Sequence, residues 1–130
     1  MSMENLWGDL SLDKETRTPY TILREQANLL TEMTEEALAG IVIRIRREPG
    51  LFTYNLEISS QAIPKYSYRL LQVNFPPLLY PLTMADFTND VEYESENEEK
   101  FIKDLGEILS SEKVKKVVLG LRSQSKAMTE

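Results

Sequence analysis

The chain has 130 residues, of which 42% are hydrophobic and 28% are charged, and its net charge is −6. These values are typical of one folded domain and differ from the weakly hydrophobic, highly charged composition of disordered chains. The acidic balance argues against binding to nucleic acid and to anionic lipid surfaces, because both attract basic proteins.

The sequence contains no histidine, no cysteine and no glycine-rich phosphate loop. It therefore has no imidazole base, no thiol nucleophile and no zinc-binding His pair. We expect no cofactor and no metal. Residues 1–15 do not resemble a secretory leader, and the longest apolar run, residues 76–82, is too short to cross a bilayer. We therefore expect a cytoplasmic protein, which the lack of cysteine also fits.

Residues 1–17 are polar apart from a few large apolar side chains, among them Leu6, Trp7 and Leu10. We interpret them as an N-terminal arm that is either loose or held against the domain by Trp7.

The domain itself begins with a predicted helix. Thr18 suits an N-cap and Pro19 suits a first helical turn, and apolar residues then recur at every third or fourth position. The pattern predicts an amphipathic helix of about 20 residues that ends at Gly40.

From residue 41 the apolar period becomes two, which is typical of strands. Residues 41–46 and 52–58 predict a hairpin whose turn contains Pro49 and Gly50 in type II geometry. A third strand follows over residues 66–75. Further strands are expected over residues 78–84, placed at an edge of the sheet because Pro81 cannot donate a ladder hydrogen bond, and briefly at Val91 and Tyr93.

Two helices are predicted to close the chain. Residues 95–98 match a capping box with Ser95 as the N-cap, and a last helix opens near Ser110 or Ser111. Residues 123–130 are expected to fray. The elements together predict an α+β fold with an N-terminal helix, an antiparallel sheet of four or five strands and two C-terminal helices packed on one sheet face, in a single domain over residues 18–122.

One face of the predicted sheet has the mixed composition of recognition surfaces. If the helices cover the face that carries Ile43 and Ile45, the other face combines aromatic, arginine, leucine and amide side chains. The predicted partner-binding residues on it are Arg44, Asn55, Tyr68, Leu70 and Gln72. An ordinary half-polar sheet explains the same residues. Pairing of this face between two copies predicts a weak homodimer through Tyr68 and Leu70.

Two other groups of residues suggest a binding site, and each also has a simpler structural explanation. Arg44 and Arg46 with Tyr68 could form a stacking platform for single-stranded nucleic acid, but the same residues keep an exposed strand soluble. Oxygen ligands gather at Asp86, Asn89, Asp90 and Glu92 without the spacing of a calcium loop, so a turn capped by its own side chains is favoured.

Residues 90–99 read DVEYESENEE and contain six acidic residues among them. Glu96, Glu98 and Glu99 are expected at the start of a helix, where carboxylates interact favourably with the helix dipole. Asp90, Glu92 and Glu94 alternate as they would on a strand with one wet side. No basic residue lies between Arg69 and Lys100, so these three acids are also predicted to bind a basic partner.

In size, acidity and lack of catalytic residue types the chain resembles the immunity proteins that neutralise toxins and the acidic chaperones of secreted effectors. This resemblance implies a non-catalytic protein-protein interaction module, of immunity type or chaperone type, that binds a basic protein partner. The interleaved helices and strands of the chaperone group differ from the order predicted here. The alternative is a small carboxylate-dependent enzyme or small-ligand carrier with an apolar pocket within residues 66–90.

Overall fold

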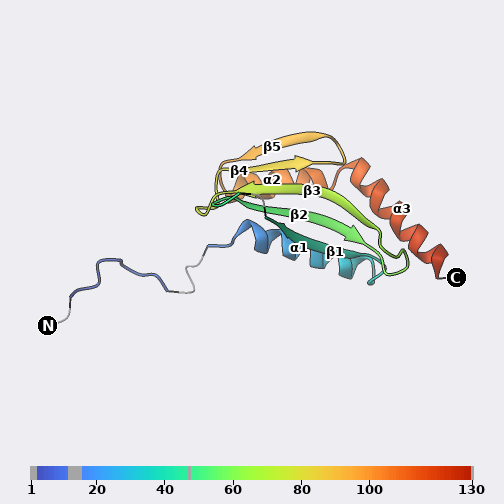
Figure 1. Ribbon diagram of the computed structural model, residues 1–130, viewed down its shortest axis with the longest axis horizontal. Coiled ribbons are helices and arrows are strands. Elements are labelled where there is room, and N and C mark those ends of the chain that lie inside the picture. The colour runs from blue at the N-terminus through green and yellow to red at the C-terminus, as the bar shows by residue number, and fades with distance from the viewer. Residues whose placement is uncertain (1–2, 12–15, 47, 130) are drawn as a thin grey trace.

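The computed structural model describes residues 3–11, 16–46 and 48–129. Figure 1 shows the elements in chain order. They are α1 (Pro19–Met33), β1 (Ala39–Ile45), β2 (Phe52–Ser59), β3 (Ser67–Phe75), β4 (Leu82–Asp86), β5 (Val91–Ser95), α2 (Glu98–Leu109) and α3 (Glu112–Met128). The strands are antiparallel and lie in the sheet in the order β1-β2-β3-β4-β5. The predicted α+β fold is confirmed.

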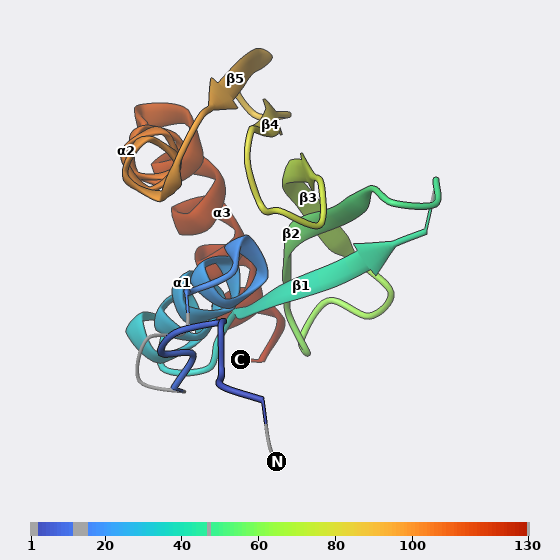
Figure 2. The same ribbon diagram turned by 90° about the vertical axis from the view of Figure 1, so that its left-hand side faces the viewer.

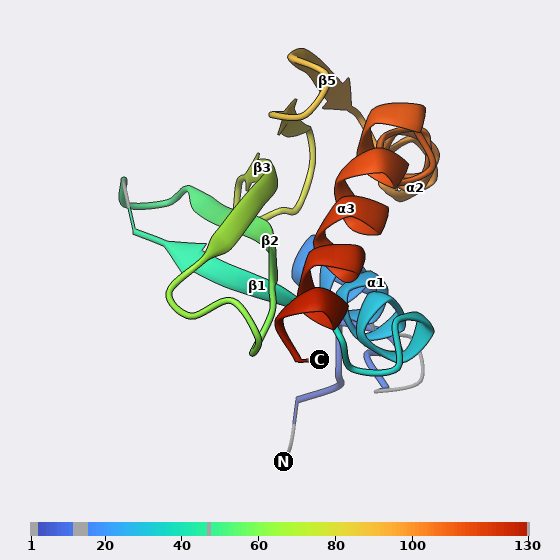
Figure 3. The same ribbon diagram turned by 90° about the vertical axis from the view of Figure 1, so that its right-hand side faces the viewer.

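The helices lie together on one side of the sheet, which curves around them, as Figure 2 and Figure 3 show from opposite ends. We call this side of the sheet the covered face and the other side the open face. The core lies between the covered face and the helices, where Leu56, Leu71 and Val73 pack with Leu23 of α1 and Phe101 of α2. Burial of this apolar surface is the main force that holds the two layers together.

Gly40 is the point at which α1 approaches the sheet most closely. A Cβ atom at this position would lie 2.4 Å from the carbonyl oxygen of Ala27 in α1, so only glycine fits. Gly40 must therefore face the helices, and Val42 and Arg44 share that side because side chains alternate along a strand. Ile43 then lies on the open face, and the prediction that Ile43 and Ile45 face the helices was wrong.

The predicted N-terminus of α1 is confirmed, and its C-terminus is earlier than expected. The Thr18 hydroxyl accepts the Thr21 N–H at 3.2 Å, and Pro19 opens the helix. At the other end, the buried Thr34 hydroxyl accepts the Leu38 N–H at 3.2 Å and so stabilises a turn. The helix stops at Met33, and β1 begins at Ala39 after this turn.

The turn between β1 and β2 has the predicted type II character. Gly50 has φ of 78°, and the Leu51 N–H donates to the Glu48 carbonyl at 3.3 Å. A positive φ at the third turn position requires glycine or a similarly tolerant residue.

The edge of the sheet does not lie where Pro81 suggested. β4 begins at Leu82, after the proline, and pairs with β3 on one side and β5 on the other. The prediction of β4 as an edge strand was therefore wrong, whereas the predicted fifth strand is present. The two edges are β1 and β5.

The C-terminal helices also begin and end differently from the prediction. Asn97 caps α2 by accepting the Lys100 N–H at 2.8 Å, while Ser95 belongs to the end of β5. Helix α3 is capped by Ser111 as predicted, and it continues past residue 122 to Met128. Ser125 is buried and its hydroxyl lies 2.6 Å from that of Ser60, a contact that holds the last turns of α3 against the chain after β2.

Among the described helices, none has the length and apolarity needed to cross a membrane.

Gly40→Ala should lower the free energy of unfolding by about 1–3 kcal/mol or more, because the added methyl overlaps backbone atoms of α1. Gly106→Ala is a matched control in α2, where the new methyl meets no atom within 4 Å. This control should raise stability by about 0.5–1 kcal/mol through helix propensity. Urea unfolding of both variants measures the difference, and equal effects would contradict the close contact at Gly40.

Candidate functional site

Arg44 does not lie on the open face, where the sequence placed it. It pairs with Tyr54 across the β1–β2 ladder, and cross-strand partners share a face. Its guanidinium lies 5.4 Å from the centre of the Phe52 ring, which is a cation–π distance. Arg44 therefore covers one end of the core on the covered face.

Tyr68 and Leu70 also lie on the covered face. The β2–β3 register shifts between Leu56 and Glu57, which leaves Leu70 as an additional residue and changes the alternation in this part of β3. Leu70 is 2% exposed and packs in the core. Tyr68 pairs with the fully buried Ile58, so it lies on the same side. The prediction that both residues form an exposed dimer contact was wrong, and Leu70→Asp would disrupt the core.

Asn55 and Gln72 do lie on the open face, where they pair across β2 and β3. The Gln72 side-chain amide donates to the Asn55 side-chain carbonyl at 2.8 Å. Asn55 is 1% exposed although no described helix covers it, because Ile43 and Gln72 flank it on the neighbouring strands. The Asn55 side-chain amide in turn donates to the Glu57 carboxylate at 3.4 Å, so these polar groups contribute mainly to cross-strand pairing.

The composition of the open face changes from apolar at β1 to acidic at β5. Two rows of cross-strand partners show this change. They are Ile43, Asn55, Gln72, Ala85 and Glu92, and Ile45, Thr53, Asn74, Thr83 and Glu94. The apolar end is accessible, since Ile41 and Ile43 are each 37% exposed. The open face therefore joins an isoleucine edge to a carboxylate edge through a band of amide and hydroxyl groups.

Asp90, Glu92 and Glu94 are exposed and lie on β5 and the turn before it, and we call them the acidic edge. Glu92 and Glu94 face the open side, as the alternation predicted. In the described part of the chain, no ion pair involves any of the three. β5 is also an edge strand, so its outer backbone groups have no neighbouring strand.

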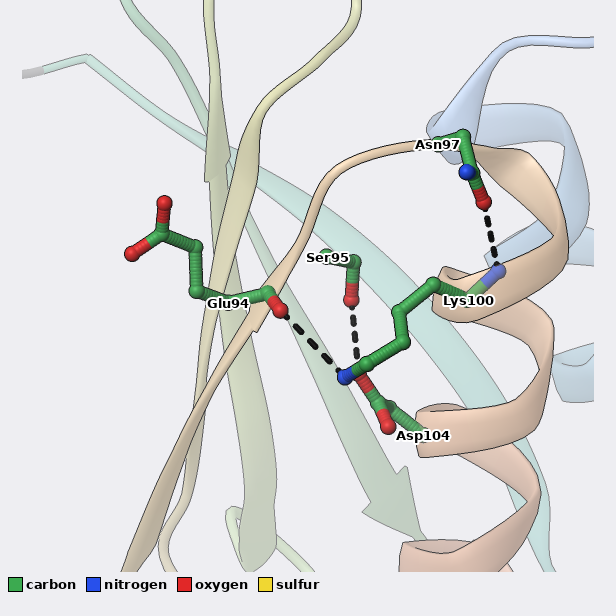
Figure 4. A network of polar contacts seen from close by, with 5 residues as sticks. All are labelled: Glu94, Ser95, Asn97, Lys100 and Asp104. Atoms are coloured by element: carbon green, nitrogen blue, oxygen red, sulfur yellow. Dashed lines mark hydrogen bonds and ion pairs between the residues drawn. The ribbon is translucent and has the colours of Figure 1, made fainter.

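Lys100 is the basic residue closest in sequence to the acidic edge, but a buried carboxylate binds it (Figure 4). Its ammonium donates to Asp104 at 2.7 Å, and a weaker contact of 3.4 Å reaches the Glu94 carbonyl oxygen. The Ser95 hydroxyl donates to the same Asp104 oxygen at 2.9 Å. The hydrogen bond to Asp104 raises the pKa of Lys100. Lys100 thus compensates Asp104, and the side chains of the acidic edge have no ion-pair partner among the described residues.

Two tyrosines near this end of the sheet, Tyr80 and Tyr93, have raised pKa values. Burial raises the pKa of Tyr93, and the charges of Glu107, Asp86 and Asp104 raise it further. Burial and the charge of Glu98 raise the pKa of Tyr80 to about 12. Both shifts favour the neutral phenol, chiefly because burial disfavours the charged form, and the nearby carboxylates add to this effect.

Asp86 forms the turn that the sequence favoured over a metal site. Its carboxylate accepts the backbone N–H groups of Thr88 and Asn89 at 3.0 and 3.1 Å and the Asn89 side-chain amide at 2.7 Å. These bonds fix the connection from β4 to β5. Asp86 therefore orients the acidic edge without belonging to it.

An apolar groove of about 630 Å³ lies on the other side of the molecule, between α1 and α3. Leu56, Ile58 and Leu70 form its floor, and Lys115 is the one charged residue among the described residues that line it. The sequence predicted a pocket within residues 66–90, but only Leu70 from that region contributes. Residues 76–81 connect β3 to β4, and Leu79 and Tyr80 of this segment pack against the core.

Sequence reasoning missed the exposed isoleucines of β1 and the groove. The signal for β1 was Gly40, whose position indicates a close helix and therefore the side that faces it. The groove could have been predicted from two helices whose apolar residues cover more than the side that packs on the sheet. Leu29 in α1 and Leu119 in α3 both line the groove outside the positions that pack on the sheet.

Comparison of the chain with protein families, with curated proteins and with solved structures found no match. Any function of the chain is therefore inferred from the chemistry of the site itself.

Tyr80→Phe should remove part of the loss of stability at alkaline pH. The wild-type phenol has a folded-state pKa of about 12, above its ordinary value of 10.0, so stability is present below pH 10 and is lost as pH rises toward 12. The hydroxyl is buried with no hydrogen-bond partner in the described residues, so the variant should be at least as stable as the wild type at pH 7. Urea unfolding across this range tests the prediction. The exposed Tyr66→Phe is the control, and equal pH dependence of all three proteins would contradict it.

Proposed function

We propose that the protein is a non-catalytic interaction module, of immunity type or chaperone type, that binds a basic protein partner along the acidic edge. The observation that carries the proposal is that Asp90, Glu92 and Glu94 are exposed on an edge strand and have no ion-pair partner in the described residues. Such a field steers a cationic partner and fixes its orientation. The unpaired edge of β5 offers backbone hydrogen bonds to the same partner.

The lack of catalytic residue types supports a binding role over an enzymatic one. The chain has no histidine and no cysteine. Its buried carboxylates are engaged in structural bonds, Asp86 with a turn and Asp104 with Ser95 and Lys100. A cytoplasmic location is part of the proposal, since a chain without cysteine needs no oxidising compartment.

Neutralising the acidic edge should abolish partner binding without changing the fold. The triple variant Asp90→Asn, Glu92→Gln and Glu94→Gln keeps the size of each side chain and leaves the α2 cap at Asn97 intact. The control neutralises three other exposed acids, Glu32, Glu35 and Glu36, as Gln. Both variants have the same net charge, so only the position of the charge differs.

Affinity purification from lysate with the three proteins, followed by mass spectrometry, is the measurement. We expect a basic protein that the wild type and the control retain and the acidic-edge variant loses. Its association rate with the wild type should fall as salt rises. Equal retention by all three proteins, or equal loss by both variants, would contradict the proposal.

The apolar groove favours one second candidate, a carrier of a small apolar ligand. Its volume of about 630 Å³ lies within the range of ligand pockets. No carboxylate lies among its described lining residues, so the groove supports ligand binding and not carboxylate catalysis. An apolar fluorescent dye should bind with one-to-one stoichiometry if this candidate is correct. Dye binding that Leu119→Glu leaves unchanged would exclude the groove as the site.

A further inference from the structure

The apolar groove leaves hydrophobic side chains in solvent at its rim. Leu119 of α3 is 58% exposed and Met33 of α1 is 77% exposed, although both line the groove. The floor residues Leu56 and Ile58 are 4% and 0% exposed, so the accessible apolar surface of the groove is at its rim, on α1 and α3. An amphipathic segment could bury both walls at once.

The N-terminal arm carries a matching set of apolar side chains. Met3, Leu6, Trp7 and Leu10 are between 72% and 87% exposed. Their spacing is i, i+3, i+4 and i+7, which places them on one side of a helix and is the pattern of helices that dock in grooves. Figure 1 shows the described part of the arm extending away from the sheet and helices. Trp7 is therefore not held against its own domain, which was one of the two arrangements considered for it.

The charges of the two surfaces are complementary. Residues 1–17 contain four acidic and two basic residues, which gives 2 − 4 = −2. Helix α3 contains five basic residues and one acidic residue, which gives 5 − 1 = +4. Lys115 lines the groove itself, so the arm would meet the basic side of the molecule.

We propose that residues 3–10 of a second copy dock as a short amphipathic helix in the apolar groove, and that the exchange is reciprocal in a homodimer. The second copy is the occupant because each chain presents both the groove and an arm whose apolar side chains Met3, Leu6, Trp7 and Leu10 are exposed. A buried tryptophan contributes about 150–250 Å² by itself, and two arms with three aliphatic residues each bring the interface above about 1,000 Å², the size expected of a specific interface. This inference is independent of the acidic edge, which lies on another part of the molecule.

Fluorescence of Trp7 tests the proposal directly, because the chain has a single tryptophan. Its emission maximum should move to shorter wavelength as protein concentration rises from the low to the high micromolar range. Light scattering on the same samples should show the mass rising from monomer to dimer. Emission typical of exposed tryptophan at every concentration would overturn the proposal. A short-wavelength emission with monomer mass would also overturn it, since the arm would then dock in its own chain.

Leu119→Glu places a charge in the groove at an exposed position, so the variant should fold normally. We expect it to stay monomeric and to keep the emission of exposed tryptophan at all concentrations. Ile102→Glu is the control, because Ile102 is similarly exposed on α2 and does not line the groove. The control should dimerise as the wild type does. A dimer that Leu119→Glu does not weaken is built on another surface and would overturn the proposal.

Gly8→Ala tests whether the docked arm is helical. Gly8 has φ of 77°, which alanine disfavours, and a methyl group at this position meets no atom within 4 Å. Alanine also favours a helix over glycine. The variant should therefore dimerise several-fold more tightly, and weaker dimerisation would overturn a helical occupant.

Discussion

The close contact between Gly40 and Ala27 determines how the rest of the molecule is arranged. A strand has two faces, and the side that meets α1 must carry the residue with no side chain. Once Gly40 faces Ala27, Val42 and Arg44 follow on the covered face, and Ile41, Ile43 and Ile45 must lie on the open face. The antiparallel ladder transmits this choice across β2 to β5, because each residue shares a face with its cross-strand partner.

This arrangement gives the molecule three surfaces of different character. They are the isoleucine edge of the open face, the acidic edge of the same face and the apolar groove. The open face runs from isoleucine at β1 through an amide band to the acidic edge at β5. The groove between α1 and α3 is apolar and has Lys115 in its wall. A basic protein and an amphipathic acidic segment would therefore bind at separate places. The Lys100 ammonium binds the buried Asp104 carboxylate, which also accepts the Ser95 hydroxyl, so in the described residues it forms no ion pair with a carboxylate of the acidic edge.

Most of the fold could be predicted from local patterns. Period and capping residues identified α1, the hairpin turn at Gly50, the fifth strand and the Ser111 cap. The errors came from tertiary contacts that a local pattern does not contain. Ser95 matches a capping box, but its hydroxyl donates to Asp104 of α2. Asn97 is the N-cap of α2 instead. The C-terminal tail is polar, yet Ser125 meets Ser60, which is 65 residues away in the chain.

The candidate site was predictable to the same extent. The positions of Glu92 and Glu94 follow from simple alternation in a short strand, and Asn55 and Gln72 follow from their strands before the bulge. Tyr68 and Leu70 lie in β3 beyond the register shift, which reverses the side they face. The sequence placed Arg44 on the wrong face because both faces of β1 carry apolar residues. Only the contact between Gly40 and α1 shows which face is covered.

The assignment of the two sheet faces is the central claim, and thiol labelling tests it most directly. The chain has no cysteine, so a single Ile43→Cys or Leu70→Cys variant carries the sole thiol. Under native conditions a thiol reagent should modify the Ile43→Cys variant rapidly, while the Leu70→Cys variant should react only as fast as the protein opens. Rapid labelling at position 70 with protection at position 43 would contradict this assignment and restore the one that the sequence pattern favoured.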